Sequence, residues 1–173
     1  MFKKYLFLIS ITFFLNISIY STGAEISVFD TAYKTGTDDL TFLIGKNSNY
    51  KKGIDSLKQA VKFEKKGKTK KANRRYNDSI KLFIEANDEN PNEPNILYYL
   101  GFIYEKVNDY TMAEIYYTEG LEIDPKHNII NAYLGDLYIE TNRIDKAKER
   151  LKVLKNCNCN QFKKLEAKIK LSN

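Results

Sequence analysis

The stretch that decides the fold runs PNILYYLGFIYEKVNDYTMAEIYYTEGLEIDPKH over residues 94–127. Its apolar and small residues fall into two sets with the spacing i, i+3 or i+4, and i+7, which places each set on one face of a helix. The first set is Leu97, Leu100, Gly101 and Tyr104, and the second is Ala113, Tyr117, Gly120 and Leu121. Gly101 and Ala113 are small enough to let two antiparallel helices approach closely. The stretch therefore predicts a helical hairpin.

The residues between the two helices favour a tight connection. Asn108 stands where a left-handed backbone ends the first helix, a conformation that Asn and Gly tolerate best. Asp109 can then cap the second helix. Pro125 stops that helix, because proline cannot continue it.

The same pattern returns 34 residues later, over residues 128–161. The coinciding pairs are Leu100 with Leu134, Gly101 with Gly135, Tyr104 with Tyr138, Asn108 with Asn142, and Ala113 with Ala147. Pro91 likewise precedes Pro125 by one period. A fixed period of this length indicates a repeat architecture in which each unit packs on its neighbour.

This pattern resembles the tetratricopeptide repeat. The sequence of residues 128–161 is also similar to that of small exported bacterial proteins of that family. The resemblance implies an all-α fold of about three stacked antiparallel helical hairpins. The third unit departs from the family pattern, with Leu151 in place of an aromatic residue, Leu154 in place of a small one and Cys159 in place of proline.

An earlier unit and a final helix complete the expected domain, residues 50–173. Residues 53–91 repeat the pattern with a second helix about two turns longer, near 68–87, whose extra turns would project past the stack. The next units are residues 94–127 and 128–159. A helix over about 161–171 would cover the open end of the last hairpin, since terminal repeats must be capped.

Residues 1–24 have the features of a signal peptide. Lys3 and Lys4 precede an apolar stretch, Tyr5–Tyr20, and Thr22-Gly23-Ala24 suits signal peptidase. The alternative is an uncleaved anchor, but the stretch is short for a bilayer and contains Asn16. We expect an exported protein, periplasmic or extracellular, with cleavage after Ala24.

Residues 25–49 lack helical spacing and are rich in turn residues. They predict a linker. The alternative is a strap that docks on the helices through its apolar residues, which are Phe29, Tyr33, Leu40, Phe42, Leu43 and Ile44.

The bulk composition is that of one soluble domain. The chain has 173 residues, 43% of them hydrophobic and 29% charged. A chain of this size can bury enough surface to fold without a metal or a disulfide. The net charge of +6 is weak support for an anionic partner, since the excess of lysine fits a general compositional bias.

The resemblance implies a binding scaffold and places a partner on the concave face, along the first helix of each pair. The residues expected there are Asn95, Tyr98, Tyr99, Phe102, Lys106, Ile129, Tyr133, Asp136 and Glu140. The family's clamp for a terminal carboxylate needs Lys, Arg and Asn, but Tyr98, Phe102, Ile129 and Tyr133 occupy those positions. The clamp is absent, and an apolar groove for a peptide or helix replaces it. The alternative is that these rings pack against the strap or the neighbouring repeats.

A basic run gives the alternative function, a structural envelope component that associates with anionic membrane or with itself. Eight of the residues from Lys62 to Arg75 are Lys or Arg, and only Glu64 opposes them. Such a cluster can meet phosphate groups. Nucleic acid is not expected after export, and a solvated helix face is the simpler interpretation.

Cys157 and Cys159 could form a disulfide in an oxidising compartment, marking the end of the last repeat helix. Free thiols and thiol exchange are the alternatives. Two thiolates are too few for structural zinc, which takes four ligands.

The sequence does not predict an enzyme. Gly67-Lys68-Thr69 lacks the preceding glycine of a phosphate-binding loop. His127, the single histidine, is expected on the surface, and no catalytic arrangement surrounds it. No cofactor, metal or small-molecule substrate is expected, and the partner is a protein or peptide.

Overall fold

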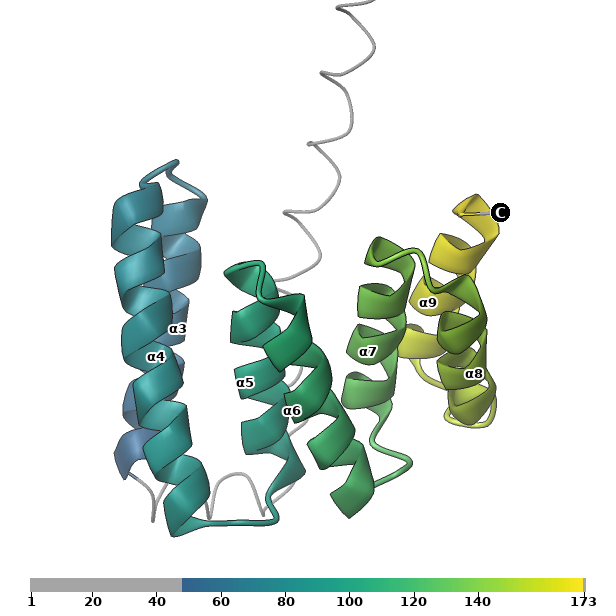
Figure 1. Cartoon of the computed structure of the whole chain (residues 1–173), viewed down its shortest axis with the longest axis horizontal. Helices are drawn as coiled ribbons and strands as arrows, with labels where there is room; N and C mark the ends of the chain where they lie inside the picture. The colour runs from purple at the N-terminus through teal and green to yellow at the C-terminus, as the bar shows by residue number, and fades with distance from the viewer. Residues whose placement is uncertain (1–47, 173) are drawn as a thin grey trace, which may run out of the picture. The chain divides into compact units, whose positions relative to one another are not determined.

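The computed structural model describes residues 48–172, which form seven α-helices and no strand within that range (Figure 1). Residues 1–47, which include the expected signal peptide and most of the expected linker, lie outside the described residues. The helices are α3 (Ser48–Glu64), α4 (Thr69–Glu89), α5 (Pro94–Lys106), α6 (Tyr110–Ile123), α7 (Asn128–Glu140), α8 (Ile144–Leu154) and α9 (Asn160–Leu171).

The helices pair as antiparallel hairpins in sequence order. The hairpins α3–α4, α5–α6 and α7–α8 pack internally, and α4 contacts α5, α6 contacts α7, and α8 contacts α9 (Figure 1). The last helix, α9, also lies against α7 and buries Leu165 and Ile169 there. The all-α fold of three stacked hairpins with a C-terminal capping helix is therefore confirmed.

Glycine allows the closest helix contacts. A Cβ atom on Gly101 would lie 2.5 Å from the ring of Tyr117, and one on Gly135 would lie 2.6 Å from Leu165 Cδ2. Within the second hairpin, the fully buried Tyr117 ring therefore packs directly on the backbone of α5. The expected role of Gly101 at the helix crossing is confirmed.

The turns inside the second and third hairpins have the expected backbone conformation, and the first of them has the expected helix cap. Asn108 and Asn142 adopt the left-handed conformation, with φ of 62° and 58°, just after α5 and α7. The Asp109 carboxylate accepts a hydrogen bond of 3.1 Å from the Met112 amide and so caps α6. Each turn therefore ends one helix and begins the next within three residues.

The first hairpin differs from the expectation in two respects. Helix α3 already begins at Ser48, so Ser48 and Asn49 belong to a helix and not to the expected linker. Both helices are long, at 17 and 21 residues against 13 and 14 in α5 and α6, whereas only the second was expected to be extended. None of residues 61–71 at the end of this hairpin is buried.

Within residues 48–172 no helix combines the length and the apolar character that crossing a membrane requires.

Candidate functional site

The nine residues expected to bind a partner lie on α5 and α7, the first helices of two successive hairpins. We call the surface that carries them the first-helix face. Helix α5 begins with Pro94 at its first turn, and the Glu93 side chain accepts a hydrogen bond of 3.1 Å from the Asn95 amide. Helix α7 begins after His127, which caps it. The two helices contact each other, so the nine residues belong to one continuous surface.

Exposure divides the nine residues into two groups. Asn95, Lys106, Ile129, Tyr133 and Asp136 are partly exposed, and Glu140 is exposed. Tyr98, Tyr99 and Phe102 are only 1%, 3% and 1% exposed. The expectation that these three rings line an open groove is therefore corrected for this structure, because their side chains are buried.

The buried rings form a network that joins all three hairpins. Tyr99 stacks on Phe83 of α4 with 5.1 Å between ring centroids, and it meets Tyr50 of α3 edge to face at 5.9 Å. On the other side Tyr98 and Phe102 contact Tyr133 of α7 at 5.2 and 5.7 Å. Aromatic pairs in these geometries add about 0.5–1.5 kcal/mol each beyond their area burial. The rings thus hold successive hairpins in place.

Acidic side chains lie beside this network. The Tyr117 hydroxyl donates a hydrogen bond of 3.1 Å to the Glu105 carboxyl. Burial, and then the nearby charge of Glu140, raises the pKa of Glu105 to about 8, although the Tyr117 hydrogen bond acts in the opposite direction. Asp136 accepts a bond of 2.5 Å from Lys168 of α9. Burial raises the pKa of Asp136 more than Lys168 lowers it. The face therefore combines an apolar interior with carboxyl groups at its margin.

A tetratricopeptide repeat family model matches residues 94–127, the stretch that folds into α5 and α6. Residues 94–127 are therefore a tetratricopeptide repeat. The match covers one hairpin, and the structure shows the same architecture in the hairpins on either side of it.

Solved structures of similar fold are also tetratricopeptide domains or chaperones. The first repeat domain of Spaghetti (RPAP3), bound to the HSP90 peptide SRMEEVD, has a TM-score of 0.53 and 16% identity, covering 73% of this chain and 97% of that one. The Arabidopsis OM64 TPR domain has a TM-score of 0.54 and 14% identity, covering 73% of this chain and 100% of that one. The Yersinia enterocolitica type III secretion translocator chaperone SycD has a TM-score of 0.51 and 17% identity, covering 70% of this chain and 89% of that one. At these identities the similarity shows the fold alone. Among curated proteins, none matches this sequence.

His127 has a structural role that the sequence analysis did not predict. It is half-buried, not on the open surface. Its Nδ1 accepts a hydrogen bond of 3.3 Å from the Ile130 amide and caps α7, while Nε2 lies 3.3 Å from Asn95 Oδ1. His127 therefore links the second hairpin to the third. A histidine between Pro125 and an apolar helix was the available signal for this cap.

We expect this link to weaken in mild acid. Burial lowers the pKa of His127 from 6.5, more than Asp124 and Glu93 raise it. The folded state thus favours neutral His127, so its contribution is present above pH 6.5 and is lost as pH falls through the lowered pKa. Protonation of Nδ1 removes the cap, at a cost of about 1 kcal/mol. Urea unfolding between pH 7.5 and 5 should show this loss in the wild type.

The matched control is His127→Asn, because asparagine caps a helix and does not titrate. Its stability should depend less on pH over the same range. An unchanged dependence in this variant would contradict the assignment.

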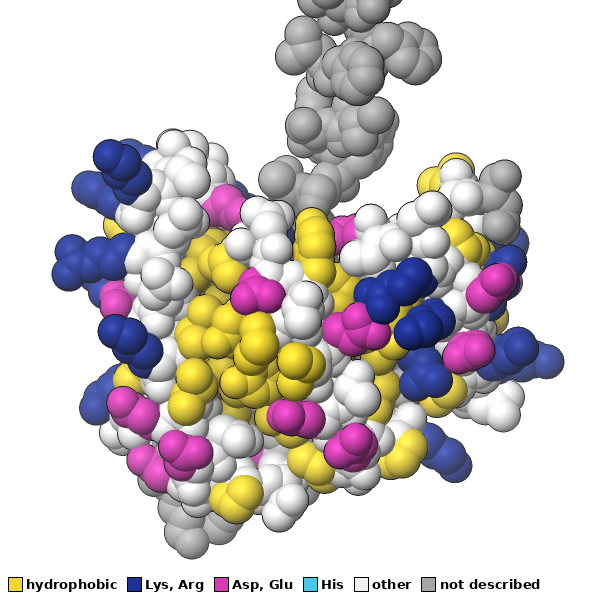
Figure 2. Space-filling model, viewed as in Figure 1, with side chains coloured by type: hydrophobic (Ala, Val, Ile, Leu, Met, Phe, Trp, Pro, Cys, Tyr) yellow, Lys and Arg dark blue, Asp and Glu magenta, His cyan; other side chains and the backbone are white. Residues whose placement is uncertain are grey.

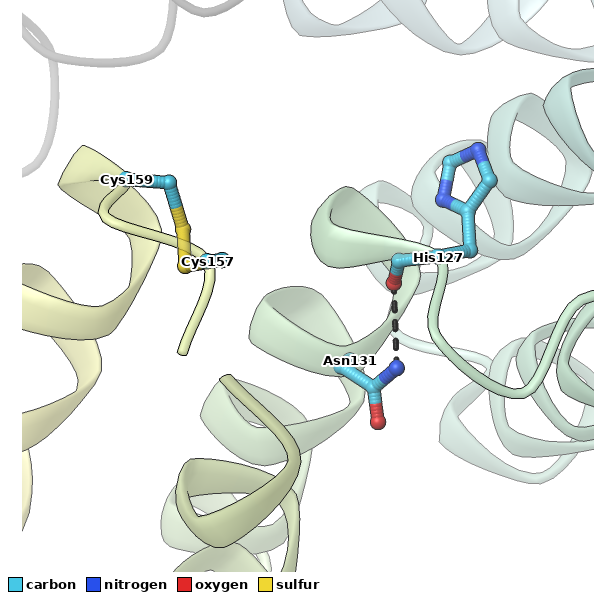
Figure 3. The surroundings of a disulfide bond; sticks show 4 residues. All are labelled: His127, Asn131, Cys157 and Cys159. Atoms are coloured by element: carbon cyan, nitrogen blue, oxygen red, sulfur yellow. Dashed lines mark hydrogen bonds between the residues drawn. A yellow bond between two sulfur atoms is a disulfide. The ribbon is translucent and has the colours of Figure 1, made fainter. Parts of the chain in front are cut away.

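The structure pairs Cys157 and Cys159 in a disulfide, with 5.1 Å between their Cα atoms (Figure 3). The bridge lies between α8 and α9, where the family's proline is missing. Asn158, inside the bridge, adopts a positive φ of 49°. In Figure 3 the bridge lies apart from the hydrogen bond of 3.0 Å that Asn131 donates to the His127 carbonyl. Within residues 48–172, no three His, Cys, Asp or Glu side chains gather closely enough to hold a metal ion.

The exposed face of α6 is a second surface, one that the sequence did not single out. A shallow hollow there is lined by Thr111, Glu114, Ile115, Thr118, Glu119 and Glu122. Ile115 is 42% exposed, and Ile84 of α4 is 37% exposed. Figure 2 shows apolar side chains gathered over α4 to α6 with acidic side chains around them. Apolar residues are spread around this helix in the sequence and do not form one stripe, so its outer residues gave no signal.

Proposed function

We propose that this protein is an exported tetratricopeptide scaffold that binds a peptide or helical segment of a protein partner on the first-helix face. The observation that supports this most is the continuity of the face across successive hairpins. Rings from α3, α4, α5 and α7 form one network, and polar and charged side chains stand beside it. A partner lying across α5 and α7 would contact Asn95, Lys106, Ile129, Tyr133, Asp136 and Glu140.

The buried rings give this face rigidity, not direct contact area. A binding surface that is already ordered loses less conformational entropy when a partner binds. The structural similarity to a domain bound to the HSP90 peptide SRMEEVD supports peptide binding by this fold. Tyr98 and Phe102 stand where the family's carboxylate clamp needs Lys and Asn, so a C-terminal carboxylate is not the feature recognised here.

The decisive experiment compares two matched double variants of the full chain. Ile129→Glu with Glu140→Lys changes the first-helix face. Ile115→Glu with Glu119→Lys makes the same two exchanges on the exposed face of α6. A protein captured from a cell-envelope extract and identified by mass spectrometry should be recovered at least tenfold less with the first variant and equally with the second.

Equal recovery of the partner with the wild type and both variants would show that it binds neither of these two surfaces. Loss of the partner only with the α6 variant would assign its binding to the exposed face of α6. Circular dichroism of both variants excludes a loss of helicity as the cause. Export rests on residues 1–24. Cell fractionation that leaves the whole chain in the cytoplasm would contradict that part of the proposal.

A further inference from the structure

A cluster of cations occupies the free end of the first hairpin. We call it the basic tip, and it consists of Lys62, Lys65, Lys66, Lys68, Lys70, Lys71, Arg74 and Arg75. All are exposed except Arg75, which is partly exposed. Figure 2 shows Lys and Arg side chains gathered at this end of the hairpin, at the upper left of the view. The cations come from the end of α3, the turn and the start of α4.

Few carboxylates in the described part of the chain neutralise these charges. Among the described residues, Arg75 is the one member of the basic tip with a carboxylate in ion-pair range, Asp78 at 3.2 Å. Glu64, the single acid of the run, instead accepts a hydrogen bond of 2.8 Å from the Tyr76 hydroxyl. Near the other end of the described stack, Arg143, Lys146, Lys148, Lys168 and Lys170 all lie within 4.0 Å of carboxylates. The basic tip thus differs from that end in how few of its cations have a carboxylate within this range among the described residues.

The stability of the hairpin does not explain the clustering of cations at the basic tip. Helix N-termini favour acidic side chains, because the helix dipole is positive there. The first turn of α4 contains no acid, and Lys68 at its N-cap forms no side-chain capping bond. Lys70 and Lys71 follow directly. Cations at this position repel both each other and the dipole, so the arrangement costs the isolated hairpin stability and favours an external anionic surface.

We propose that the basic tip attaches the protein to the anionic lipid headgroups of a bilayer. The cations surround the end of a hairpin and so face an extended array of charges better than a single small anion. Six of the eight are lysines, which act as point charges and do not need the bidentate geometry that arginine offers. Clusters of this size bind acidic lipid surfaces, with each Lys or Arg near the surface contributing to attachment.

A lipid surface fits the tip better than single-stranded nucleic acid does. Single-stranded nucleic acid binding uses aromatic side chains on which bases stack. The single ring in the run, Phe63, has Lys71 Nζ 5.8 Å from its centroid, so a cation lies over it. The apolar stretch Tyr5–Tyr20 is also expected to bring the chain to a membrane during export. The tip lies on α3 and α4, apart from the partner-binding residues of α5 and α7, so this proposal stands independently of the proposed function.

The test measures binding of the full chain to two kinds of vesicle, one of pure phosphatidylcholine and one with a third of phosphatidylglycerol. The ratio of the two partition coefficients isolates the charge effect, because any contribution of Tyr5–Tyr20 enters both. The tip variant is Lys66→Gln, Lys68→Gln and Lys70→Gln. The matched control is Lys152→Gln, Lys155→Gln and Lys163→Gln, which removes three exposed lysines from the other end of the described helices.

The tip variant should lose the preference for phosphatidylglycerol by about a hundredfold, and the control should keep most of it. The wild-type preference should also weaken between 50 and 300 mM salt, because counterions screen exposed charges. Equal loss in both variants would show an effect of net charge alone and overturn the assignment to the tip. If the tip variant lost binding to a short DNA duplex but bound vesicles as the wild type does, the proposal of a lipid surface would be overturned in favour of nucleic acid.

Discussion

Replacing Tyr117 with alanine is expected to lower the free energy of unfolding by about 3–5 kcal/mol. The side chain is fully buried, and its ring packs against the backbone of Gly101 in the neighbouring helix. Alanine would leave a cavity at this crossing, which the two helices cannot close without shifting. Urea unfolding followed by circular dichroism measures the loss, and the melting temperature should fall by about 10 °C.

Two controls make this prediction specific. Tyr117→Phe keeps the ring and removes only the hydroxyl that donates to Glu105, so we expect a loss of about 1 kcal/mol. Ile115→Ala shortens an exposed side chain on the same helix and should change stability by less than about 0.5 kcal/mol. If Tyr117→Ala were no worse than Ile115→Ala, the packing at Gly101 would not hold the hairpin together.

Phe83→Ala is expected to have an effect of similar size, about 3–5 kcal/mol. Phe83 is fully buried, stacks on Tyr99 of the second hairpin and meets Tyr50 of α3 edge to face at 5.7 Å. Its ring also lies 3.2 Å from the position that a Cβ on Gly53 would occupy. The substitution therefore removes packing within the first hairpin and between the first and second hairpins together.

The neighbouring residue supplies the control. Ile84 is 37% exposed on the same turn of α4, and Ile84→Ala should cost less than about 1 kcal/mol. Limited proteolysis separates the two parts of the effect, since loosening between hairpins should expose the α4–α5 connection first. Cleavage that begins instead in α7 or α8 would contradict the role of Phe83 in joining the hairpins.

The features that the sequence predicted correctly depend on neighbours within one hairpin. Gly101 is small because the Tyr117 ring lies against it, and Asn108 is left-handed because a helix ends there. Both requirements act over fewer than 20 residues and leave a periodic trace. The length of α3 left no such periodic trace in the sequence, since Ser48 and Asn49 are turn-forming residues that nevertheless begin a helix.

The candidate site was less predictable, because burial on the first-helix face depends on contacts between hairpins. The helical period places Tyr98, Tyr99 and Phe102 away from the packing face of their own hairpin. It does not say that Phe83, Tyr50 and Tyr133 meet them there. The contact between His127 and Asn95 was missed for a related reason. Asn95 is 32 residues earlier and comes near only after two hairpins stack.

The long first hairpin has a consequence for motion. Because none of residues 61–71 is buried, their backbone is held by local hydrogen bonds, such as that of 2.8 Å from the Gly67 amide to the Glu64 carbonyl. Segments of this kind open without global unfolding, and their amide protons exchange with solvent early. The end of the hairpin can thus fray and re-form while Ala72, Tyr76 and the helices beyond keep their places. Its lysines are then free to adjust to an uneven array of charges without disturbing the stack behind them.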